Sequence, residues 1–262
     1  MRLPVLTFHR VAPEEHGVVG LKPVSPEQFR RYLRWISGAG FTPITPAEWL
    51  SHVRSGTPDL RRPVLITFDD AYAELEAHAL PALEEARFAS VVFVPTDFIG
   101  ATNRWDQKHG FTDIPLMDER SIAAWSGRGV IFGSHGASHA DLAELEQDAR
   151  CAELDRSMRR LREITGAGPD AIAYPYGAVN ADAATDVARR FSLGFTTQPG
   201  LNAVSTNPVE LRRAAVPPSA SWLRFRLLLA LGFDPIYRLA EIIRPRRWLR
   251  GLLARIGRPQ LR

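Results

Sequence analysis

Short apolar runs alternate along most of the chain with longer segments in which apolar residues recur at helical spacing. The runs indicate strands because they are short and rich in β-branched residues. They cover Val5–His9, Thr42–Ile44, Val64–Phe68, Ser90–Val94, Val130–Gly133, Ile172–Tyr174, Leu193–Thr197 and Leu211–Val216. The predicted helices cover Glu27–Ser37, Ala47–Val53, Ala73–Ala86, Asp141–Ile164 and Asp182–Arg190. This order predicts an α/β protein built of βαβ units around a mostly parallel sheet.

So many strand–helix units favour a barrel, in which functional residues gather at the carboxyl ends of the strands. Asp69 and Asp70 follow the third predicted strand, His135 follows the fifth, and Tyr174–Tyr176 follow the sixth. The sequence therefore predicts that these side chains meet in one site.

The two adjacent carboxylates, Asp69 and Asp70, need a turn in the chain. Neighbouring strand residues point to opposite faces, so both can reach one site only if the strand ends there. Burying two carboxylates together is costly unless a proton or a cation lies between them. The simpler alternative is that one of them caps the helix predicted over Ala73–Ala86.

His135 and His139 stand four residues apart after another apolar run. This spacing predicts that both imidazoles lie on one face of a helical turn, as in sites where two histidines share a metal. A lone histidine is more often a core or surface residue, but a pair together with a free Asp pair favours a metal site. One Asp and two His leave coordination positions open, which is typical of catalytic sites. The donor set suits Zn²⁺, Co²⁺ or Ni²⁺ and does not choose among them.

Three motifs, in order, resemble those of the polysaccharide deacetylases, the NodB-homology group of carbohydrate esterases. Thr67–Asp70 (TFDD) resembles the first, Gly133–Leu142 (GSHGASHADL) the second and Ala173–Gly177 (AYPYG) the third. Each motif alone is weak support, and the three in order are strong. The similarity extends from about Leu3 to Val216, and it implies a distorted (β/α) barrel.

The resemblance also implies a role for each motif residue. Asp70, His135 and His139 would bind a divalent metal, most simply zinc, and Asp69 would be the general base. The backbone N–H of Tyr176 would stabilise an oxyanion. The chemistry is coherent in itself, because a metal lowers the pKa of water bound to it and a nearby carboxylate can remove the proton. The implied activity is removal of N-acetyl groups from an N-acetylhexosamine-containing polysaccharide or lipid-linked glycan.

The general acid is where the sequence departs from the common family pattern. No histidine follows His139, so the Leu-x-His motif of many members is absent. His9, in Thr-Phe-His-Arg at the end of the first strand, resembles the Tyr-His opening of one branch of the family. The first and last strands of a closed barrel are neighbours, so His9 could occupy the same space, and its pKa suits a proton donor near neutrality. The alternative is that His9 simply ends a buried strand.

Other departures leave the metal ligands and the base intact. Arg213 resembles a late arginine of the same branch and would steady Asp69, with Arg212 as the fallback. Ala71 replaces the usual glycine after the Asp pair, which is expected to change only the turn. A fourth Asp-x-x-Asp-Trp motif is not recognisable.

Composition sets limits without naming a function. The 262 residues are 45% hydrophobic and 24% charged, which is ordinary for a globular protein. Cys151 is the single cysteine, so the chain cannot form an internal disulfide. No leader-like start and no apolar stretch of about 18–20 residues is recognisable, so a cytoplasmic location is expected.

The segment 221–262 is rich in arginine, contains no lysine, and accounts for much of the basic excess behind the net charge of +4. Within it, Trp222–Leu231 and Arg246–Ile256 predict short basic amphipathic helices. Such helices favour anionic membrane surfaces, here the inner face of a membrane; packing on the barrel is the alternative. The prediction is a barrel domain over 1–220 and a basic helical extension over 221–262. No nucleic-acid recognition motif accompanies the charge, so a nucleic-acid partner is not expected.

Two further segments have uncertain meaning from sequence alone. Gly100–Glu119 could touch substrate, but a variable surface insertion is the favoured interpretation. The alternating charges of Asp141–Ile164 predict a solvated outer face. Two other functions stay open, because a fold and its ligands do not specify a substrate: hydrolysis of another non-peptide amide, or binding of glycan or membrane without turnover.

Overall fold

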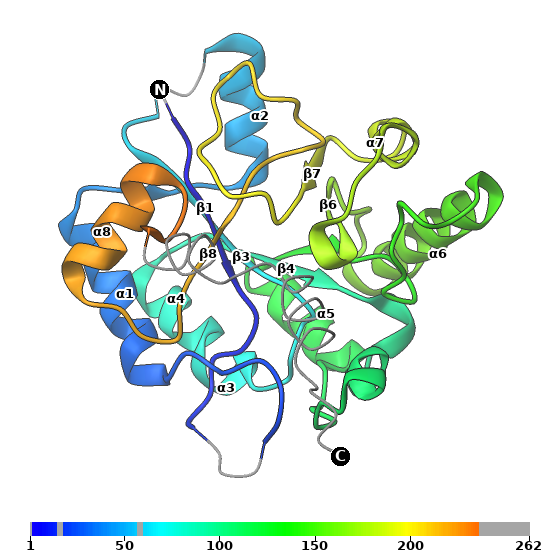
Figure 1. Cartoon of the computed structure of the whole chain (residues 1–262), viewed down its shortest axis with the longest axis horizontal. Helices are drawn as coiled ribbons and strands as arrows, with labels where there is room; N and C mark the ends of the chain where they lie inside the picture. The colour runs from blue at the N-terminus through cyan, green and yellow to red at the C-terminus, as the bar shows by residue number, and fades with distance from the viewer. Residues whose placement is uncertain (1, 15–17, 57–59, 236–262) are drawn as a thin grey trace, which may run out of the picture.

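A curled sheet of parallel strands forms the centre of the protein (Figure 1), whose computed structural model describes residues 2–14, 18–56 and 60–235. Its strands lie in the order β7-β6-β5-β4-β3-β1-β8, and β2 pairs with β3 beside this path. Their bounds are β1 Val5–Phe8, β2 Thr42–Pro43, β3 Pro63–Phe68, β4 Val91–Val94, β5 Ile131–Ser134, β6 Ala171–Ala173, β7 Leu193–Phe195 and β8 Ala214–Ala215.

The two ends of the sheet are brought together into a barrel. Phe195, at the end of β7, forms a parallel bridge with Leu211, and the Thr196 N–H donates to the Leu211 carbonyl at 2.9 Å. A few residues later the same segment pairs with β1 as β8. The predicted strand Leu211–Val216 is thus wrong in extent, because one part of it bridges β7 and only Ala214–Ala215 pairs with β1. The (β/α) barrel prediction is confirmed.

Helices cover the outside of the barrel between successive strands (Figure 1). Their bounds are α1 Pro26–Gly38, α2 Pro46–Ser55, α3 Leu75–His78, α4 Leu80–Ala86, α5 Glu119–Gly127, α6 Gln147–Thr165, α7 Ala181–Ala188 and α8 Trp222–Leu231. Three 3₁₀ turns add η1 Thr96–Phe98, η2 Arg104–His109 and η3 Pro175–Gly177. Local signals begin several helices: Ser25 caps α1 and Thr45 forms a capping box with Glu48 in α2, each followed by a proline.

Two predicted helices differ from the observed ones. The helix predicted over Ala73–Ala86 is divided at Ala79 into α3 and α4, because Pro81 cannot donate the backbone hydrogen bond that would continue it. The helix predicted over Asp141–Ile164 begins only at Gln147. Before it, the Asp141 carboxylate accepts a hydrogen bond from the Ala143 N–H at 3.0 Å, which favours a turn over a helix.

Side-chain alternation along the strands separates two regions of core. On β1 and β3, Val5 and Leu65 point into the barrel with Phe93 and Phe195, whereas their sequence neighbours pack outward against the helices. Thr7, Thr67 and Asp69 continue the inward-facing set toward the carboxyl ends of the strands. The apolar plug of the barrel therefore ends in polar side chains at this mouth.

The last described helix packs against the first. The Phe225 ring of α8 stacks on Tyr32 of α1 at 4.5 Å between centroids, and Trp222 contacts Trp35. Arg246–Ile256, the second predicted tail helix, lies outside the described residues, and the division at residue 220 stays a prediction. Within the ranges that the structure describes, every helix is too short or too polar to cross a membrane.

Candidate active site

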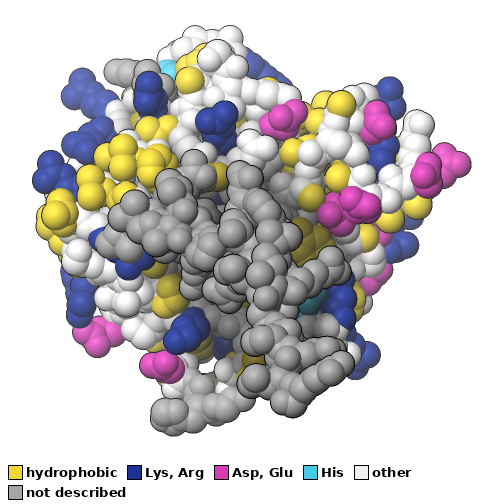
Figure 2. All heavy atoms as spheres, in the orientation of Figure 1, with side chains coloured by type: hydrophobic (Ala, Val, Ile, Leu, Met, Phe, Trp, Pro, Cys, Tyr) yellow, Lys and Arg dark blue, Asp and Glu magenta, His cyan; other side chains and the backbone are white. Residues whose placement is uncertain are grey.

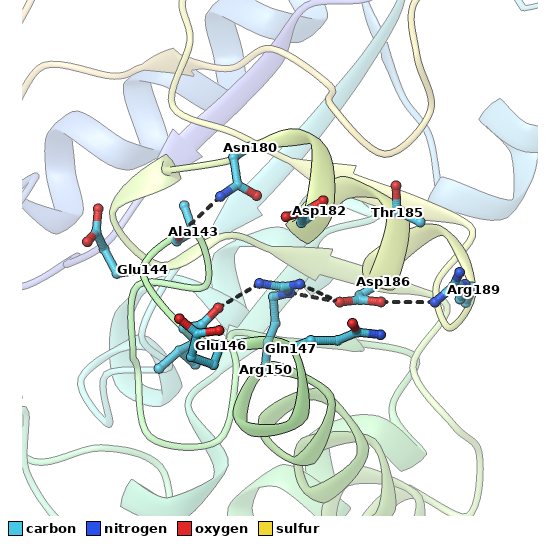
Figure 3. A pocket seen from close by; sticks show the side chains of 11 residues that line it. Ala143, Glu144, Glu146, Gln147, Arg150, Asn180, Asp182, Thr185, Asp186 and Arg189 are labelled. Atoms are coloured by element: carbon cyan, nitrogen blue, oxygen red, sulfur yellow. Dashed lines mark hydrogen bonds and ion pairs between the residues drawn. The ribbon is translucent and has the colours of Figure 1, made fainter.

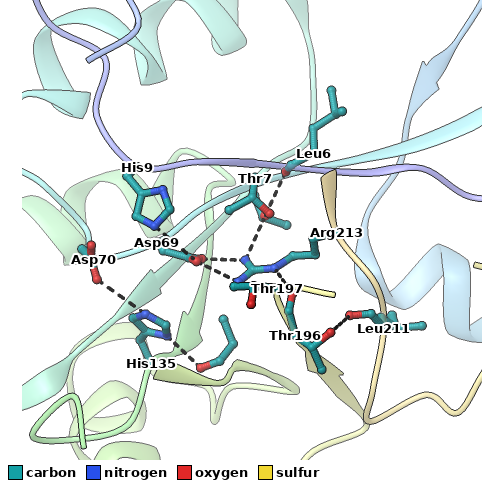
Figure 4. A network of polar contacts seen from close by, with 12 residues as sticks. Leu6, Thr7, His9, Asp69, Asp70, His135, Thr196, Thr197, Leu211 and Arg213 are labelled. Carbon is teal, nitrogen blue, oxygen red and sulfur yellow. Dashed lines mark hydrogen bonds and ion pairs between the residues drawn. The ribbon is translucent and has the colours of Figure 1, made fainter. Parts of the chain in front are cut away.

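Asp69 and Arg213 form a buried ion pair at the mouth of the barrel (Figure 4). Two guanidinium nitrogens of Arg213 donate to the two carboxylate oxygens of Asp69, each at 2.7 Å. A third nitrogen, Nε, donates to the Thr196 carbonyl at 2.8 Å. Burial alone would raise the pKa of Asp69, but Arg213, together with nearby His135 and His9, holds that pKa below its usual range. Of the two arginines considered from the sequence, the observed partner of Asp69 is Arg213, the one preferred there, and not Arg212.

The chain turns sharply directly after Asp69. Asp70 and Ala71 both have positive φ angles, 72° and 52°, a region that is unfavourable for residues with a side chain. This turn brings Asp70 to the same side of the sheet as Asp69, although neighbouring strand residues would diverge. Ala71 stands where the family usually has glycine, so the turn is kept at some cost in backbone energy.

Three buried side chains converge beside this turn. The Asp70 Oδ1 lies 3.5 Å from the His135 Nε2 and 3.3 Å from the His139 Nε2. Together the three residues offer one ligand atom each within 4.8 Å of one another. Asp70 therefore does not cap α3 but faces the two histidines.

The hydrogen bonds of this cluster fit a bound cation. His135 Nδ1 lies 2.7 Å from the Ala173 carbonyl, which can only accept, so this nitrogen carries the proton and Nε2 presents a lone pair to Asp70. Among the described residues, Asp70 Oδ1 and His139 Nδ1 have no hydrogen-bond partner. Burial lowers the pKa of His135 to about 4, so the ring is neutral at pH 7, as a metal ligand must be. Acceptor atoms that face one another in a buried site need a proton or a cation between them.

The histidines are not on a helix, contrary to the prediction from their spacing. His135 follows β5 directly, and His139 lies in a loop with a φ of 58°. A carboxylate from α6 holds this loop: Glu153 accepts from the Ala137 N–H at 2.8 Å and from the Ser138 hydroxyl at 3.0 Å, and also from the Ser138 N–H. Both Glu153 and its α6 neighbour Arg150 are buried, so the predicted solvated face is wrong at these two positions.

His9 lies near Asp69, and Tyr176 lies against His139. The His9 Nε2 is 3.9 Å from the Asp69 Oδ2, too far for a hydrogen bond, and 35% of its side chain is exposed. The Tyr176 ring contacts His139 edge-on at 4.8 Å between centroids, and its backbone has a φ of 59°. The tight turn needs Gly177, because a Cβ there would stand 2.0 Å from the Thr197 hydroxyl oxygen.

The segment Gly100–Glu119 also belongs to the site, so its interpretation as a surface insertion is wrong. The Trp105 ring of η2 stacks on His139 at 4.5 Å and 15°, and the neighbouring Asp106 is buried. Lys108 lies over the Tyr176 ring at 5.7 Å. An isolated Trp-Asp pair in a loop was the only sequence signal for this wall of the site.

The mouth of the barrel thus holds a carboxylate, Asp69, paired with Arg213, beside an Asp-His-His cluster. This arrangement is typical of hydrolase sites in (β/α) barrels. The family model for polysaccharide deacetylase matches residues 57–196, which include the Asp pair, both histidines and Tyr176. The chain belongs to the polysaccharide deacetylase family. His9 and Arg213 lie outside the matched region, so their places in the site come from the barrel closure alone.

Relatives and solved structures agree with this assignment. The chain is 24% identical over 225 residues to YxkH of Bacillus subtilis, whose name assigns it provisionally to the polysaccharide deacetylases; the match covers 86% of this chain and 75% of that protein. It is 23% identical to the poly-β-1,6-N-acetyl-D-glucosamine N-deacetylase of Staphylococcus epidermidis over 67% of this chain and 61% of that one. The Streptococcus pyogenes deacetylase PplD, solved with acetate, superposes with a TM-score of 0.75 at 22% identity, covering 88% and 98% of the two chains. At this identity the structural match supports the fold.

Proposed function

We propose that this protein is a metal-dependent hydrolase that removes N-acetyl groups from an N-acetylhexosamine-containing glycan. The observation that carries the proposal is the buried convergence of Asp70, His135 and His139 on facing acceptor atoms, beside a carboxylate paired with Arg213. The deacetylase relatives support the reaction class, and the name of the S. epidermidis relative supports an N-acetylated sugar.

Asp70, His135 and His139 would hold the divalent metal, with zinc the first choice and cobalt or nickel the alternatives. A metal there would supply a positive charge that acidifies water and stabilises an oxyanion. Asp69 is the proton acceptor: it takes a proton from the water molecule as the water oxygen adds to the acetyl carbonyl carbon. Its low pKa keeps it ionised at neutral pH, and the two hydrogen bonds from Arg213 hold its orientation.

The leaving amine needs a proton when its bond to the acyl carbon breaks. His9 is the proposed donor, because it is partly exposed at the mouth and its Nε2 lies 3.9 Å from the Asp69 Oδ2 (Figure 4). The backbone N–H of Tyr176 is the proposed donor to the oxyanion. Acetate and the free amine of the sugar are then the products, and the water atoms are fully accounted for between them.

Acetate release from N-acetylglucosamine oligomers and from lipid-linked glycans tests this proposal. Metal-loaded wild type is compared with Asp69→Asn, and the metal content of both is measured. Asp182→Asn, an exposed change on α7, is the matched control and should retain activity. Loss of acetate release in Asp69→Asn at unchanged metal content supports the proposal. If the fully metal-loaded wild type releases no acetate, the deacetylase proposal is wrong. Activity on another amide would then favour the second hydrolase function, and no activity on any amide would favour binding without turnover.

We also propose that the arginine-rich extension brings the protein to an anionic membrane surface on the cytoplasmic side. Most of this extension lies outside the described residues. The exposed leucines of α8, Leu223, Leu227 and Leu231, support apolar contact at its start. Co-sedimentation with anionic vesicles, compared between wild type and Leu223→Ser/Leu227→Ser, measures this; unchanged binding in the variant would remove α8 from the proposal.

A further inference from the structure

A groove of about 720 Å³ opens beside His9 on the β1–β8 side of the mouth. Its walls come from the segment after β1, the segment after β8, and the turn after α8. His9, Thr197 and Arg213 connect it to the candidate active site. A group bound there would therefore be continuous with a sugar placed at Asp69.

The groove offers mostly apolar side chains. They are Leu21, Val24, Pro199, Ala215, Val216, Pro217, Pro218 and Phe233. Val24 and Val216 are buried, so they form part of the floor, and the prolines bring no backbone N–H to the wall. Phe8 of β1 adds a buried ring, and the other lining residues are polar: Thr7, His9, Lys22, Thr197, Asp234 and three arginines.

The arginines that line the groove already have carboxylate partners. Arg10 donates to the Glu74 carboxylate at 2.8 and 2.9 Å, and Arg213 is paired with Asp69. The Arg224 Nε donates to both carboxylate oxygens of Asp234 at 3.0 and 3.1 Å. Their charges are thus largely compensated within the protein.

Exposed apolar side chains also occur in the two segments that border the groove. On one side Val19 is 56% exposed and Leu21 39%; on the other, the α8 residue Leu223 is 64% exposed. Arg224 of the same helix lines the groove, so α8 borders it. Figure 2 shows apolar side chains gathered over the position of α8 in Figure 1. An apolar surface that runs into an apolar groove suits one end of an amphiphile.

We propose that this groove binds the apolar portion of the substrate, so that the substrate is an amphiphilic N-acetylated glycoconjugate, a glycolipid, and not a free polysaccharide chain. This inference rests on the proposed deacetylase function. The sugar would lie at Asp69 and His9, and the apolar group would extend past Val216 toward the exposed face of α8.

The octyl and methyl glycosides of N-acetylglucosamine are the probes, used with the full chain and below the micelle concentration of the octyl compound. Acetate release gives kcat/KM for each, and calorimetric titration gives each Kd without turnover. We expect both ratios to favour the octyl compound by about tenfold, which corresponds to about 1.4 kcal/mol and to burial of about two methylene groups. Leu21→Asp should remove most of this preference. Val204→Asp, which changes an equally exposed valine outside the groove, should keep it.

Equal kcat/KM and Kd for the two glycosides would overturn the groove proposal while leaving the deacetylase function standing. A trimer of N-acetylglucosamine that surpasses the octyl glycoside, with no response to Leu21→Asp, would show that the groove binds sugars. Preferential octyl binding that is lost in Leu21→Asp, without acetate release from any compound, would support the groove and contradict the deacetylase function.

Discussion

Replacement of Arg213 by methionine is the sharpest test of how the site is built. Met matches much of the length of the side chain but brings neither charge nor donors. In the wild-type protein the guanidinium donates two hydrogen bonds to Asp69, one to the Thr196 carbonyl and one to the Thr67 hydroxyl, and the arginine is nearly fully buried. Arg213→Met leaves a buried carboxylate without its counter-charge.

The expected loss of unfolding free energy follows from these contacts. Breaking a buried ion pair from one side costs about 3–5 kcal/mol, and the unpaired Thr196 carbonyl adds about 1 kcal/mol. Domains are stable by about 5–15 kcal/mol, so the variant is expected to fold marginally. The double variant Arg213→Met/Asp69→Asn removes the unpaired charge as well, and it should recover about 2 kcal/mol over Arg213→Met alone.

Urea unfolding followed by circular dichroism, in the presence of a chelator, measures these differences. The matched control is Arg150→Met, which breaks a second buried pair, Arg150 with Asp186, between α6 and α7 (Figure 3). It should cost less stability than Arg213→Met, because Asp186 keeps Arg189 as a partner at 3.2 Å, and acetate release per folded molecule should persist. In Arg213→Met acetate release should fall at least tenfold, because Asp69 loses both its orientation and its low pKa.

The pH dependence has a definite sign. The folded-state pKa of Asp69 is lowered, so the contribution of the pair is complete above about pH 4 and is lost as the pH falls through the folded-state pKa. In Arg213→Met, burial without the guanidinium raises the pKa of Asp69, and protonation relieves the penalty. The stability gap between wild type and variant should therefore narrow from pH 7 to pH 5. A gap below about 1 kcal/mol at pH 7, or one that widens toward pH 5, would refute this reasoning.

Three further predictions concern the Asp-His-His cluster, the loop that carries its histidines, and His9. Glu153→Leu should weaken cobalt or zinc binding in equilibrium dialysis by about tenfold to a hundredfold, because the loop between the two histidines loses its hydrogen-bond acceptor. Glu153→Gln keeps an oxygen acceptor and should lose less metal affinity. Equal metal affinities in the two variants would contradict this explanation. In the metal-free protein, burial lowers the pKa of His135 to about 4, so the free energy of unfolding should be highest above about pH 6.5 and should fall toward pH 4. In urea unfolding, His135→Asn should make the free energy of unfolding less dependent on pH over this range. An unchanged pH dependence would mean that other groups cause it. His9→Asn should lower kcat about a hundredfold with metal content unchanged; a wild-type kcat in this variant would exclude His9 as the proton donor.

The helices and strands that the sequence predicted best are those that depend on residues close together in the chain. Apolar β-branched runs became β1, β3 and β4, and capped, proline-initiated segments became α1 and α2. Where the prediction was wrong, the deciding interaction was a particular side chain or a distant partner. Pro81 divided one helix, and the strand expected over Leu211–Val216 was divided between β7 and β1.

The site shows the same division. The types and order of Asp69, Asp70, His135 and His139 were readable because metal chemistry requires those donors, whichever loops carry them. Their geometry was not, since spacing suggested a helical turn and the histidines lie in a loop held by Glu153. Glu153 was expected on a solvated helix face. The spacing of charges along a helix cannot distinguish a carboxylate in water from a carboxylate that accepts hydrogen bonds from buried N–H groups.

By itself, the sequence determined the fold class, the family and the donor atoms of this protein. Tertiary structure alone decided that the two histidines lie in a loop held by Glu153, that Trp105 stacks on His139, and that an apolar groove adjoins His9. The physical reason is that donors and strand propensities are properties of single residues and short runs. Ion pairs, ring contacts and grooves arise only when barrel closure brings together segments that lie far apart along the chain.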